Sequence, residues 1–372
     1  MPDVLVVGGG PVGTLLSAEL ARRGVDVDVL ERRTVPGEGT RAIGVHSPVL
    51  AALEASGTTE RLLASAVRVS RGEARSAGRL LGVVRFDRLH RRFPFVATLP
   101  QAATEAALAA EAPPPRRGAT VTAVRPEGRG IRVSLEEGDD LSAPIVVVAG
   151  GWRARDLVYR RGAVPVKRYP DRYLMADVAA GRDDDVAVID IDGRGVLEAF
   201  PLPGGRRRYV AWDDGPTDRG LAERLREALR ARGEGAAAAQ VAEATAFEVR
   251  RAVARRLRRG GLFAIGDTAH EVSPIGGQGM NLGLLDAATL APLLATWVRS
   301  GVAPDAALAR WERRRVASAR AAARLASVNT AAGRALPPAA DALRRGALRV
   351  AVTPPGARLL AHAYSMGFDR DA

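Results

Sequence analysis

The N-terminal residues combine a buried-strand pattern, a glycine-rich turn and a helical pattern. Val4 to Val7 are apolar, Gly8, Gly10 and Gly13 follow with the spacing G-x-G-x-x-G, and Thr14 to Arg23 have helical periodicity. In such a unit the first glycine permits the tight turn, the second lets the backbone approach a pyrophosphate, and the third lets the helix pack closely on the strand. The pattern predicts an α/β fold that opens with a Rossmann-like unit.

A second strand pattern follows and ends on an acid. Val25 to Leu30 alternate, and Glu31 comes directly after them. A carboxylate at this place accepts hydrogen bonds from the two ribose hydroxyls of an adenosine. Its charge also disfavours a 2′-phosphorylated nucleotide, because two negative groups would repel each other. The alternative is a glycine-rich turn that binds nothing, which the combination of strand, helix and acid disfavours.

A second glycine-rich segment lies far downstream. It begins as Gly266-Asp267-Thr268-Ala269-His270 and continues over residues 273–281 as Ser-Pro-Ile-Gly-Gly-Gln-Gly-Met-Asn. The carboxylate of Asp267 can hold the hydroxyls of a polyol, and a helix start with few side chains can hold a ring carbonyl on its backbone N–H groups. Flavin cofactors carry both groups, so the segment predicts a flavin site. His270 is expected to be a loop residue that packs or bonds to backbone.

Together the two segments resemble the group A flavoprotein monooxygenases of the para-hydroxybenzoate hydroxylase type, in particular the aromatic-polyketide hydroxylases. The resemblance covers about residues 1–320. It implies an α/β architecture in which a Rossmann-like FAD-binding domain of the GR2 type carries an inserted mixed β-sheet substrate domain and C-terminal helices. The residues that it implies for FAD binding are Gly8, Gly10, Pro11, Val12, Gly13, Glu31, Arg32, Arg41, Gln101, Asp267, Gly277, Gly279, Met280 and Asn281.

Two shorter segments support the resemblance. Residues 41–46, Arg-Ala-Ile-Gly-Val-His, resemble the family loop whose arginine approaches the FAD pyrophosphate. Residues 99–105, Leu-Pro-Gln-Ala-Ala-Thr-Glu, resemble the segment whose glutamine touches the flavin. By this resemblance, Arg41 would lie near the FAD pyrophosphate and Gln101 would touch the flavin.

The resemblance also implies a reaction. NAD(P)H would reduce FAD, and the reduced flavin and O2 would form a C4a-hydroperoxide that hydroxylates an aromatic or polyketide-derived small molecule in secondary metabolism. Backbone N–H groups beside Gly277 would stabilise negative charge on the reduced ring. Pro274, Gly277 and Gln278 are the expected flavin environment, and the sequence identifies no general base.

One family motif is altered. The buried-strand pattern Ile145 to Val148 leads into Ala149-Gly150-Gly151, so Gly150 stands where the family has an aspartate that serves FAD and nicotinamide. Glycine offers no side-chain acceptor. Water or a neighbouring acid such as Asp156 would then substitute. The alternative is an FAD- or ligand-binding tailoring or partner protein with lost or altered redox activity, and epoxidation or Baeyer–Villiger oxygen insertion are further outcomes on the same fold.

The chain is expected to divide into alternating segments. The FAD-binding domain takes residues 1–70, 99–165 and 250–325, the substrate-binding sheet takes 71–98 and 166–249, and a C-terminal helical appendage takes 326–372. The middle segment alternates like antiparallel strands with one polar face. Within it, residues 233–239 predict a flexible, low-complexity stretch.

Few side chains stand out as substrate contacts. Tyr173, Tyr209 and Trp212 lie in the alternating middle segment and could stack on a planar substrate, although core packing is an equal alternative. His46 follows the Arg41 segment and could face the flavin. Pro274 would shape the cavity wall. All five are weak candidates for the substrate site.

Composition narrows the remaining function classes. The chain has 55 Lys and Arg against 42 Asp and Glu, a formal net charge of +13, and only 4% aromatic residues. Basic clusters such as Arg313 to Arg315 predict solvated faces, and so few aromatic side chains disfavour nucleic acid as a partner. A positive field favours anionic cofactors and phenolate or carboxylate substrates instead.

The cysteine and histidine content, the N-terminus and the length of the apolar runs indicate whether a metal site, a membrane span or a leader is expected. There is no cysteine, which excludes disulfides and cysteine-bound zinc, and the four histidines lack metal-ligand spacing, so no metal is expected. The N-terminus enters the glycine motif without a basic leader, and no unbroken run of about eighteen apolar residues occurs. The expectation is a cytoplasmic monomer or homodimer without a membrane span, which takes an aromatic or polycyclic substrate and O2.

Overall fold

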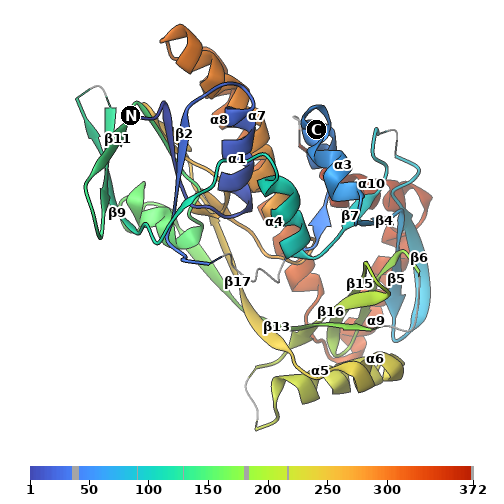
Figure 1. Ribbon diagram of the computed structural model, residues 1–372. Helices are drawn as coiled ribbons and strands as arrows, with labels where there is room; N and C mark the ends of the chain where they lie inside the picture. Colours follow the sequence, from blue (N-terminus) through green and yellow to red (C-terminus); the bar gives the residue numbers. More distant parts are fainter. Residues whose placement is uncertain (36–41, 90, 129, 180–183, 216–217, 370–372) are drawn as a thin grey trace.

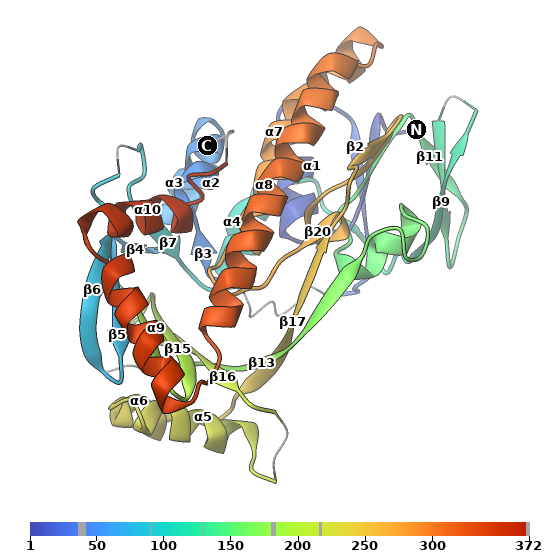
Figure 2. The same ribbon diagram turned by 180° about the vertical axis from the view of Figure 1, so that it is seen from behind.

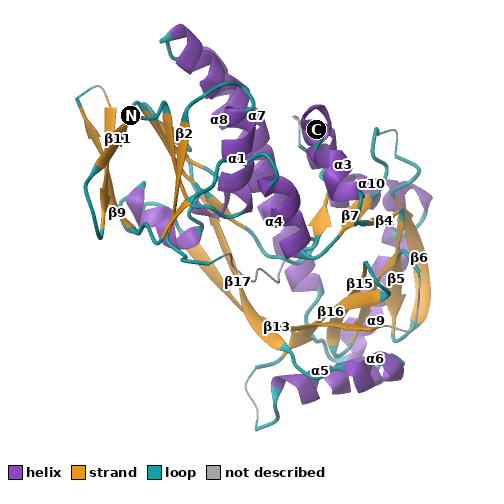
Figure 3. Cartoon of the chain, viewed as in Figure 1, coloured by secondary structure: helices purple, strands orange, loops and turns teal. Residues whose placement is uncertain are grey.

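The computed structural model describes residues 1–35, 42–89, 91–128, 130–179, 184–215 and 218–369. A parallel sheet with long helices against it forms one half of the molecule, and a larger, curved sheet forms the other (Figures 1 and 3).

The first half is built on a six-stranded sheet. Its strands, in spatial order, are β18 (Arg258–Arg259), β19 (Leu262–Ala264), β12 (Ile145–Val148), β1 (Val4–Val7), β2 (Val27–Glu31) and β8 (Arg116–Arg117). From β19 to β8 each strand runs parallel to its neighbour, so the carboxyl ends of these strands share one edge. Ligands in open parallel sheets bind beyond that edge.

Both faces of the six-stranded sheet are covered, which explains why β1 and β12 are apolar throughout. Val4 and Val6 face one core, whereas Leu5 and Val7 face another. The first core lies under four helices, α1 (Pro11–Ala21), α4 (Gln101–Ala109), α7 (Gly279–Ser300) and α8 (Asp305–Ala332). The second lies under a three-stranded sheet, β11 (Leu141–Ala143), β10 (Gly130–Leu135) and β9 (Val121–Glu127).

The second half is an eight-stranded mixed sheet. Its order is β20 (His270–Glu271), β17 (Thr245–Val253), β13 (Val166–Ala179), β16 (Arg206–Asp213), β15 (Gly195–Leu202), β14 (Val186–Asp192), β5 (Arg71–Ser76) and β6 (Arg79–Arg85). Only β14 and β5 pair in parallel among these described strands. The long strands β13 and β17 run toward the first half, where β20 follows the 266–268 turn (Figure 1).

One face of the eight-stranded sheet is covered by α5 (Leu221–Arg230) and α6 (Gly235–Gln240). The expectation of a flexible stretch at 233–239 is therefore wrong. Alanine has the highest helix propensity, and Ala237 and Ala238 are buried against the sheet, so this low-complexity segment forms a packed helix.

Small elements join the two halves. A three-stranded sheet contains β3 (Gly44–Val45), β7 (Val96–Thr98) and β4 (Val67–Val69). Beside it lie α2 (Ser47–Leu53) and α3 (Thr58–Leu63), and short 3₁₀ turns occur at η1 (Glu54–Ser56), η2 (Trp152–Leu157) and η3 (Gly266–Thr268).

The C-terminal helices α9 (Pro338–Ala351) and α10 (Pro354–Tyr364) fold back onto the molecule (Figure 2). Ala361 of α10 packs with Val84 and Phe86 at the β6 edge. The last described residue, Asp369, lies buried against α8. The C-terminal segment thus contacts both halves.

Helix α7 is the only helix in the described ranges with the length and hydropathy of a membrane-spanning segment. Asn281 and Asp286 interrupt its apolar residues, so it contains no unbroken apolar run of about eighteen residues. Its most apolar window is 61% buried inside the protein. Leu282, Leu285 and Leu290 belong to the core shared with α1 and α8, and this packing accounts for the apolar composition.

The predicted fold class, a Rossmann-like α/β domain with an inserted mixed sheet and C-terminal helices, is confirmed. The proposed domain boundaries stay a prediction.

Gly13→Ala is expected to destabilise the fold, because the added methyl group would lie 1.9 Å from the carbonyl oxygen of Gly8. Overpacking of this kind costs about 1–3 kcal/mol of unfolding free energy, which urea denaturation measures. Gly346→Ala, inside α9 with no described heavy atom within 4 Å of the added methyl, is the matched control and should gain about 0.5–1 kcal/mol. Equal stability of the Gly13→Ala variant and the wild type would contradict this packing.

Candidate functional site

The first glycine turn joins β1 to α1. Gly8 has a φ of +114°, and a methyl group there would lie 2.6 Å from the carbonyl oxygen of Ala149. In the described chain no side chain caps α1, and no heavy atom lies within 4 Å of the place that a methyl on Gly10 would take. The N-terminus of α1 therefore opens onto space that suits an anionic group.

Glu31 lies buried at the end of β2, beside this turn. Its carboxylate accepts hydrogen bonds from the backbone N–H of Gly9 (2.7 Å) and from the backbone and side chain of Arg33 (2.8 and 3.0 Å). Burial raises the pKa of Glu31, but the Arg33 and Gly9 hydrogen bonds outweigh burial and hold the pKa below its ordinary value. Three of the roughly four acceptor sites of the carboxylate are taken, and the remaining one, on Oε2, can accept from a hydroxyl. The neighbouring Arg32, which is predicted to contact FAD, is exposed, and its role stays a prediction.

The second glycine turn meets the first in space. A methyl group on Gly266 would lie 3.2 Å from Cγ2 of Val12, and one on Gly283 would lie 2.6 Å from the same atom. Gly266 also has a φ of +61°. Val12 of the first motif thus fits against two glycines of the second, so the absence of side chains lets α1, α7 and η3 approach one another.

Arg155 links the second turn to the segment after β12. Its guanidinium donates to the carbonyl oxygens of Asp267 (2.8 Å) and Thr268 (3.2 Å) and lies 3.4 Å from the Glu271 carboxylate. In return, the Thr268 hydroxyl donates to the carbonyl oxygen of Gly151 (3.0 Å). Asp267 is exposed, and the Arg155 contact to its backbone carbonyl oxygen holds it at the sheet edge.

The structure gives a reason for glycine at position 150. A methyl group on Gly150 would lie 2.7 Å from Cβ of Ala154, because η2 turns tightly against it. Asp156, the acid expected to substitute, has a 64% exposed side chain that pairs with Arg161 at 3.8 Å.

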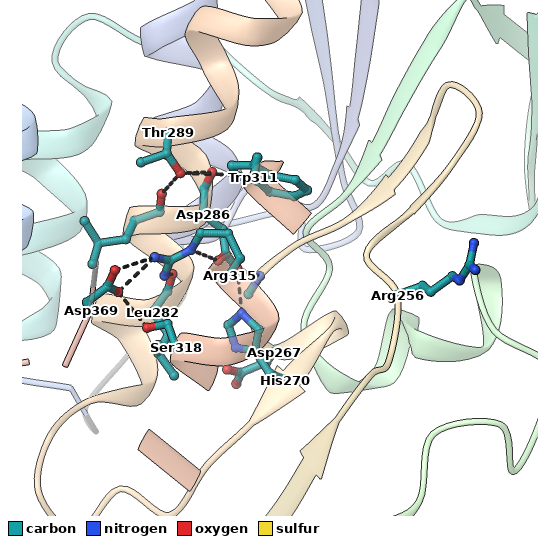
Figure 4. Close-up of polar contacts among 12 residues, drawn as sticks. Arg256, Asp267, His270, Leu282, Asp286, Thr289, Trp311, Arg315, Ser318 and Asp369 are labelled. Atoms are coloured by element: carbon teal, nitrogen blue, oxygen red, sulfur yellow. Dashed lines mark hydrogen bonds and ion pairs between the residues drawn. The ribbon is translucent and has the colours of Figure 1, made fainter. Parts of the chain in front are cut away.

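A buried charge network lies beneath the second turn (Figure 4). Asp286 of α7 accepts from the backbone N–H of Gly266 (3.0 Å), pairs with Nε2 of His270 (2.6 Å) and accepts from Nε of Arg315 (2.8 Å). Arg315 also binds the carboxylate of Asp369 (2.8 Å). Burial raises the pKa of Asp286, yet the charges of His270 and Arg315 hold the pKa below its ordinary value.

Sequence reasoning missed this network. The Arg313 to Arg315 cluster was expected to be solvated, which is wrong for Arg315, whose side chain is 0% exposed. An unpaired acid in an apolar helix, as at position 286, is the signal that could have indicated a buried partner. His270 is a side-chain partner of Asp286 as well as part of β20.

His46 and Asn281 connect β3 and the start of α2 to the second turn. Asn281 accepts from the His46 backbone N–H (2.8 Å) and donates to the carbonyl oxygens of Gly44 (2.8 Å) and Gly277 (3.0 Å). The His46 ring lies beside Gly277, and a methyl on that glycine would be 3.4 Å from Nε2. Burial lowers the pKa of His46 to about 4, so the ring is neutral at pH 7.

The other predicted flavin contacts differ in exposure and in where their side chains point. Pro274 and Gly277 are exposed, as a ring-contacting surface requires. The Gln278 side chain points away from that surface, because its amide donates to the carbonyl oxygen of Ala363 in α10 (2.9 Å). Gln101 accepts from the Ala42 backbone N–H (3.2 Å). Arg41 lies outside the described residues.

The remaining predicted contacts lie at helix starts. Pro11 and Val12 begin α1, and Gly279 and Met280 begin α7, where no described side chain caps the helix.

The three aromatic candidates of the middle sheet do not share a face. Tyr173 and Trp212 belong to the cluster that includes Ile275 of the 273–281 segment, the predicted flavin loop. Tyr209 packs on the opposite face, under α5 and α6, where its hydroxyl donates to Glu234 (3.1 Å). The prediction that Tyr209 contacts the substrate is therefore wrong, because Tyr209 lies on the sheet face opposite to Tyr173 and Trp212. Since Tyr209 and Trp212 are three positions apart on one strand, alternation alone places them on opposite faces.

Asp286→Asn is expected to lower the unfolding free energy at pH 7 by about 3–5 kcal/mol, because the buried guanidinium of Arg315 then loses one of its two carboxylate partners. The pKa of Asp286 is lowered in the folded protein, so its stabilisation is present above the unfolded value of about 4 and lost as pH falls further. Urea denaturation from about pH 7 to about pH 3 should therefore show a weaker acid dependence in the variant. Asp305→Asn removes a 76% exposed partner of Arg258 and should change little; a similar loss in both variants would contradict a special role for Asp286.

Comparison with known proteins gives relatives that are monooxygenases by name. The chain is 33% identical to 6-methylpretetramide 4-monooxygenase of Streptomyces rimosus over 80% of this chain and 56% of that protein. It is 31% identical to rifampicin monooxygenase of Streptomyces venezuelae (83% and 67%) and 30% identical to pentachlorophenol 4-monooxygenase of Sphingobium chlorophenolicum (81% and 60%). The chain thus spans 56–67% of the length of these relatives.

Solved structures share the fold. The p-nitrophenol 4-monooxygenase PnpA of Pseudomonas putida DLL-E4 superposes with a TM-score of 0.87 over 100% of this chain and 99% of its own, at 22% identity, which is a likeness of fold. The anhydrotetracycline hydroxylase OxyS of Streptomyces rimosus superposes with a TM-score of 0.77 over 98% of this chain and 75% of its own, at 28% identity.

The family model described as the FAD binding domain matches residues 1–326, which include both glycine turns and Glu31. The chain belongs to this FAD-binding family.

Proposed function

We propose that this protein is an FAD-dependent monooxygenase that uses NAD(P)H and O2 to hydroxylate an aromatic or polyketide-derived small molecule. The observation that carries the proposal is the meeting of the two glycine turns, in which Val12 lies against Gly266 and Gly283. One extended dinucleotide can then contact both turns at the shared edge of the parallel strands.

The residues present fit FAD. The open N-terminus of α1 suits the pyrophosphate, and the Glu31 carboxylate suits the adenosine ribose. Asp267, exposed at the second turn, suits the hydroxyls of the ribitol chain. The uncapped N-terminus of α7 suits the polar edge of the ring.

The chemistry that FAD would supply is reduction by a nicotinamide and activation of dioxygen for transfer to an electron-rich ring. The chain's own residues would bind and orient the flavin and the substrate and shield them from water. Backbone N–H groups at the start of α7, near Gly279 and Met280, would stabilise negative charge on the ring edge. Pro274 and Gly277 present a smooth exposed surface, and the cluster around Tyr173 and Ile275 would exclude water from the opposite side.

The names of the relatives support the substrate class. A pretetramide, a rifampicin and a chlorinated phenol are the substrates that those names print, and each contains an aromatic ring. We infer that this chain also takes an aromatic substrate, as a monomer or homodimer in the cytoplasm, where nicotinamide nucleotides are available.

A second candidate is an FAD- or ligand-binding tailoring protein with altered redox activity. Gly150 favours it, because the close contact with Ala154 leaves no room for the usual acid and Asp156 is paired with Arg161 instead.

Anaerobic reduction separates the two candidates. The purified protein with FAD is expected to lose its yellow colour when NADPH or NADH is added without oxygen, and to recover the colour in air. Visible absorbance follows both steps. A bound flavin that stays oxidised with either nucleotide and with aromatic ligands would favour the second candidate.

Asp267→Ala is expected to weaken FAD binding by about 1.5–3 kcal/mol, the range for a hydrogen bond to a charged group. Fluorescence titration of the apoprotein with FAD measures the change. Asp156→Ala removes another exposed carboxylate, on the neighbouring η2, and should leave the affinity unchanged. The same FAD affinity in the Asp267→Ala variant and the wild type would count against the assigned role.

A further inference from the structure

The inner face of the eight-stranded sheet carries one isolated acid. Glu198 lies in the middle of β15, between Val196 and Phe200 on the same face. Its cross-strand neighbours are Ile189 on β14 and Val210 on β16. Val196, Ile189 and Val210 all belong to the apolar cluster that also contains Ile275 of the flavin loop.

The Glu198 residue is 6% exposed, yet no described residue forms a hydrogen bond or ion pair with its carboxyl group. The other charged groups near this face are already paired. Arg208 binds Asp177 through both oxygens (2.6 Å each), and Asp171 binds Arg334 (2.8 Å) and Trp212 (3.1 Å). A buried carboxyl without a partner is costly for stability, so a role outside folding is the natural explanation.

The charge of Glu198 influences two phenols. Tyr173 comes from β13, and Tyr364 comes from α10, which covers the flavin loop at Gly276. Burial raises the pKa of Tyr364 to about 12, and the charge of Glu198 adds to the shift. The pKa of Tyr173 is raised by burial and then by the same charge. Glu198 thus lies on the sheet face that packs against Ile275, and its charge acts on Tyr364 of the C-terminal helix.

We propose that Glu198 is the catalytic residue that binds the ring hydroxyl of a phenolic substrate and takes up its proton. This inference rests on the proposed function. The proton passes from the substrate oxygen to a carboxylate oxygen of Glu198, and the electron pair of the O–H bond stays on the substrate oxygen. The phenolate is more electron-rich at its ring carbons, and the proton returns when the product hydroxyl leaves. The neighbouring Val196, Ile189 and Val210 are apolar, as is the ring of such a substrate.

The environment of Glu198 suits this role. Burial raises the pKa of Glu198 to about 8, closer to that of a phenol than an ordinary carboxyl is. A base is most effective when its pKa lies near the working pH. Neither Tyr173 nor Tyr364 loses its proton in this range, because burial raises the pKa of both phenols.

The test compares a phenol with its methyl ether in the FAD-loaded protein. The probes are 2-naphthol and 2-methoxynaphthalene, and binding is followed by flavin fluorescence from about pH 6 to about pH 9. The wild type should bind the naphthol at least tenfold more tightly at the higher pH, the effect of a hydrogen bond to a charged acceptor. The preference should fall as pH drops through the pKa of Glu198.

Glu198→Gln keeps the shape but cannot titrate, so it should lose both the preference and its pH dependence. Glu198→Asp should retain a pH-dependent preference. Glu248→Gln, on the exposed side of β17, is the matched control and should behave as the wild type. Equal binding of the two probes by the wild type, binding of neither, or an unchanged preference in Glu198→Gln would overturn the inference.

Unfolding experiments give a readout that needs neither flavin nor turnover. The folded protein keeps the Glu198 proton up to about pH 8, whereas the unfolded chain loses it near pH 4.5. The folded state therefore binds more protons between these values, and this group makes stability fall as pH rises through that window. Glu198→Gln should flatten the fall; an unchanged profile in the variant would also contradict the inference.

These outcomes separate the two proposals. A protein that is reduced by nicotinamide but shows no effect of Glu198→Gln on probe binding refutes only the role of Glu198. A protein that is never reduced, yet shows the preference and its loss in Glu198→Gln, refutes only the monooxygenase.

Discussion

The buried carboxylate of Asp286 is the interaction on which the site depends. It binds the backbone of Gly266, the ring of His270 and the guanidinium of Arg315, and so joins η3, β20 and α8 to α7. Arg315 extends the same network to Asp369 near the C-terminus. A charge network without access to water tolerates little displacement, because each charge relies on its partners. The second glycine turn is therefore held rigidly, with α1 packed against it through Val12.

This half of the molecule, which contains a buried charge network, faces the mainly apolar inner side of the eight-stranded sheet. Arg208 and Asp171 on this face have charged partners, whereas Glu198 forms no hydrogen bond or ion pair with a described residue. The C-terminal helix α10 closes the arrangement, since Ala363 holds Gln278 and Tyr364 lies against Gly276. An apolar surface with one polar group suits a flat aromatic ring that carries a hydroxyl, and pairing of the other charges keeps them from competing for it.

Local patterns were sufficient for the cofactor half. The glycine spacing, the apolar strands and Glu31 predicted the βαβ unit and its turn, because those features depend on a few neighbouring residues. The same reasoning failed where partners are distant in sequence. Arg315 looked solvated within a basic cluster, and the alanine-rich 233–239 segment looked flexible although α6 begins within it at Gly235. Tyr209 was a different case, since strand alternation would have placed it on the outer face.

The sequence by itself determined the opening βαβ unit, the two glycine turns and the acid at the end of β2, because backbone conformation and hydrophobic periodicity act over short distances. Only the tertiary structure decided that the turns meet across Val12, that Asp286 and Arg315 form one buried network, and that Glu198 faces the flavin loop. The physical reason is that burial and pairing of a charge depend on residues from separate elements, and those elements come together only when the sheets and helices pack.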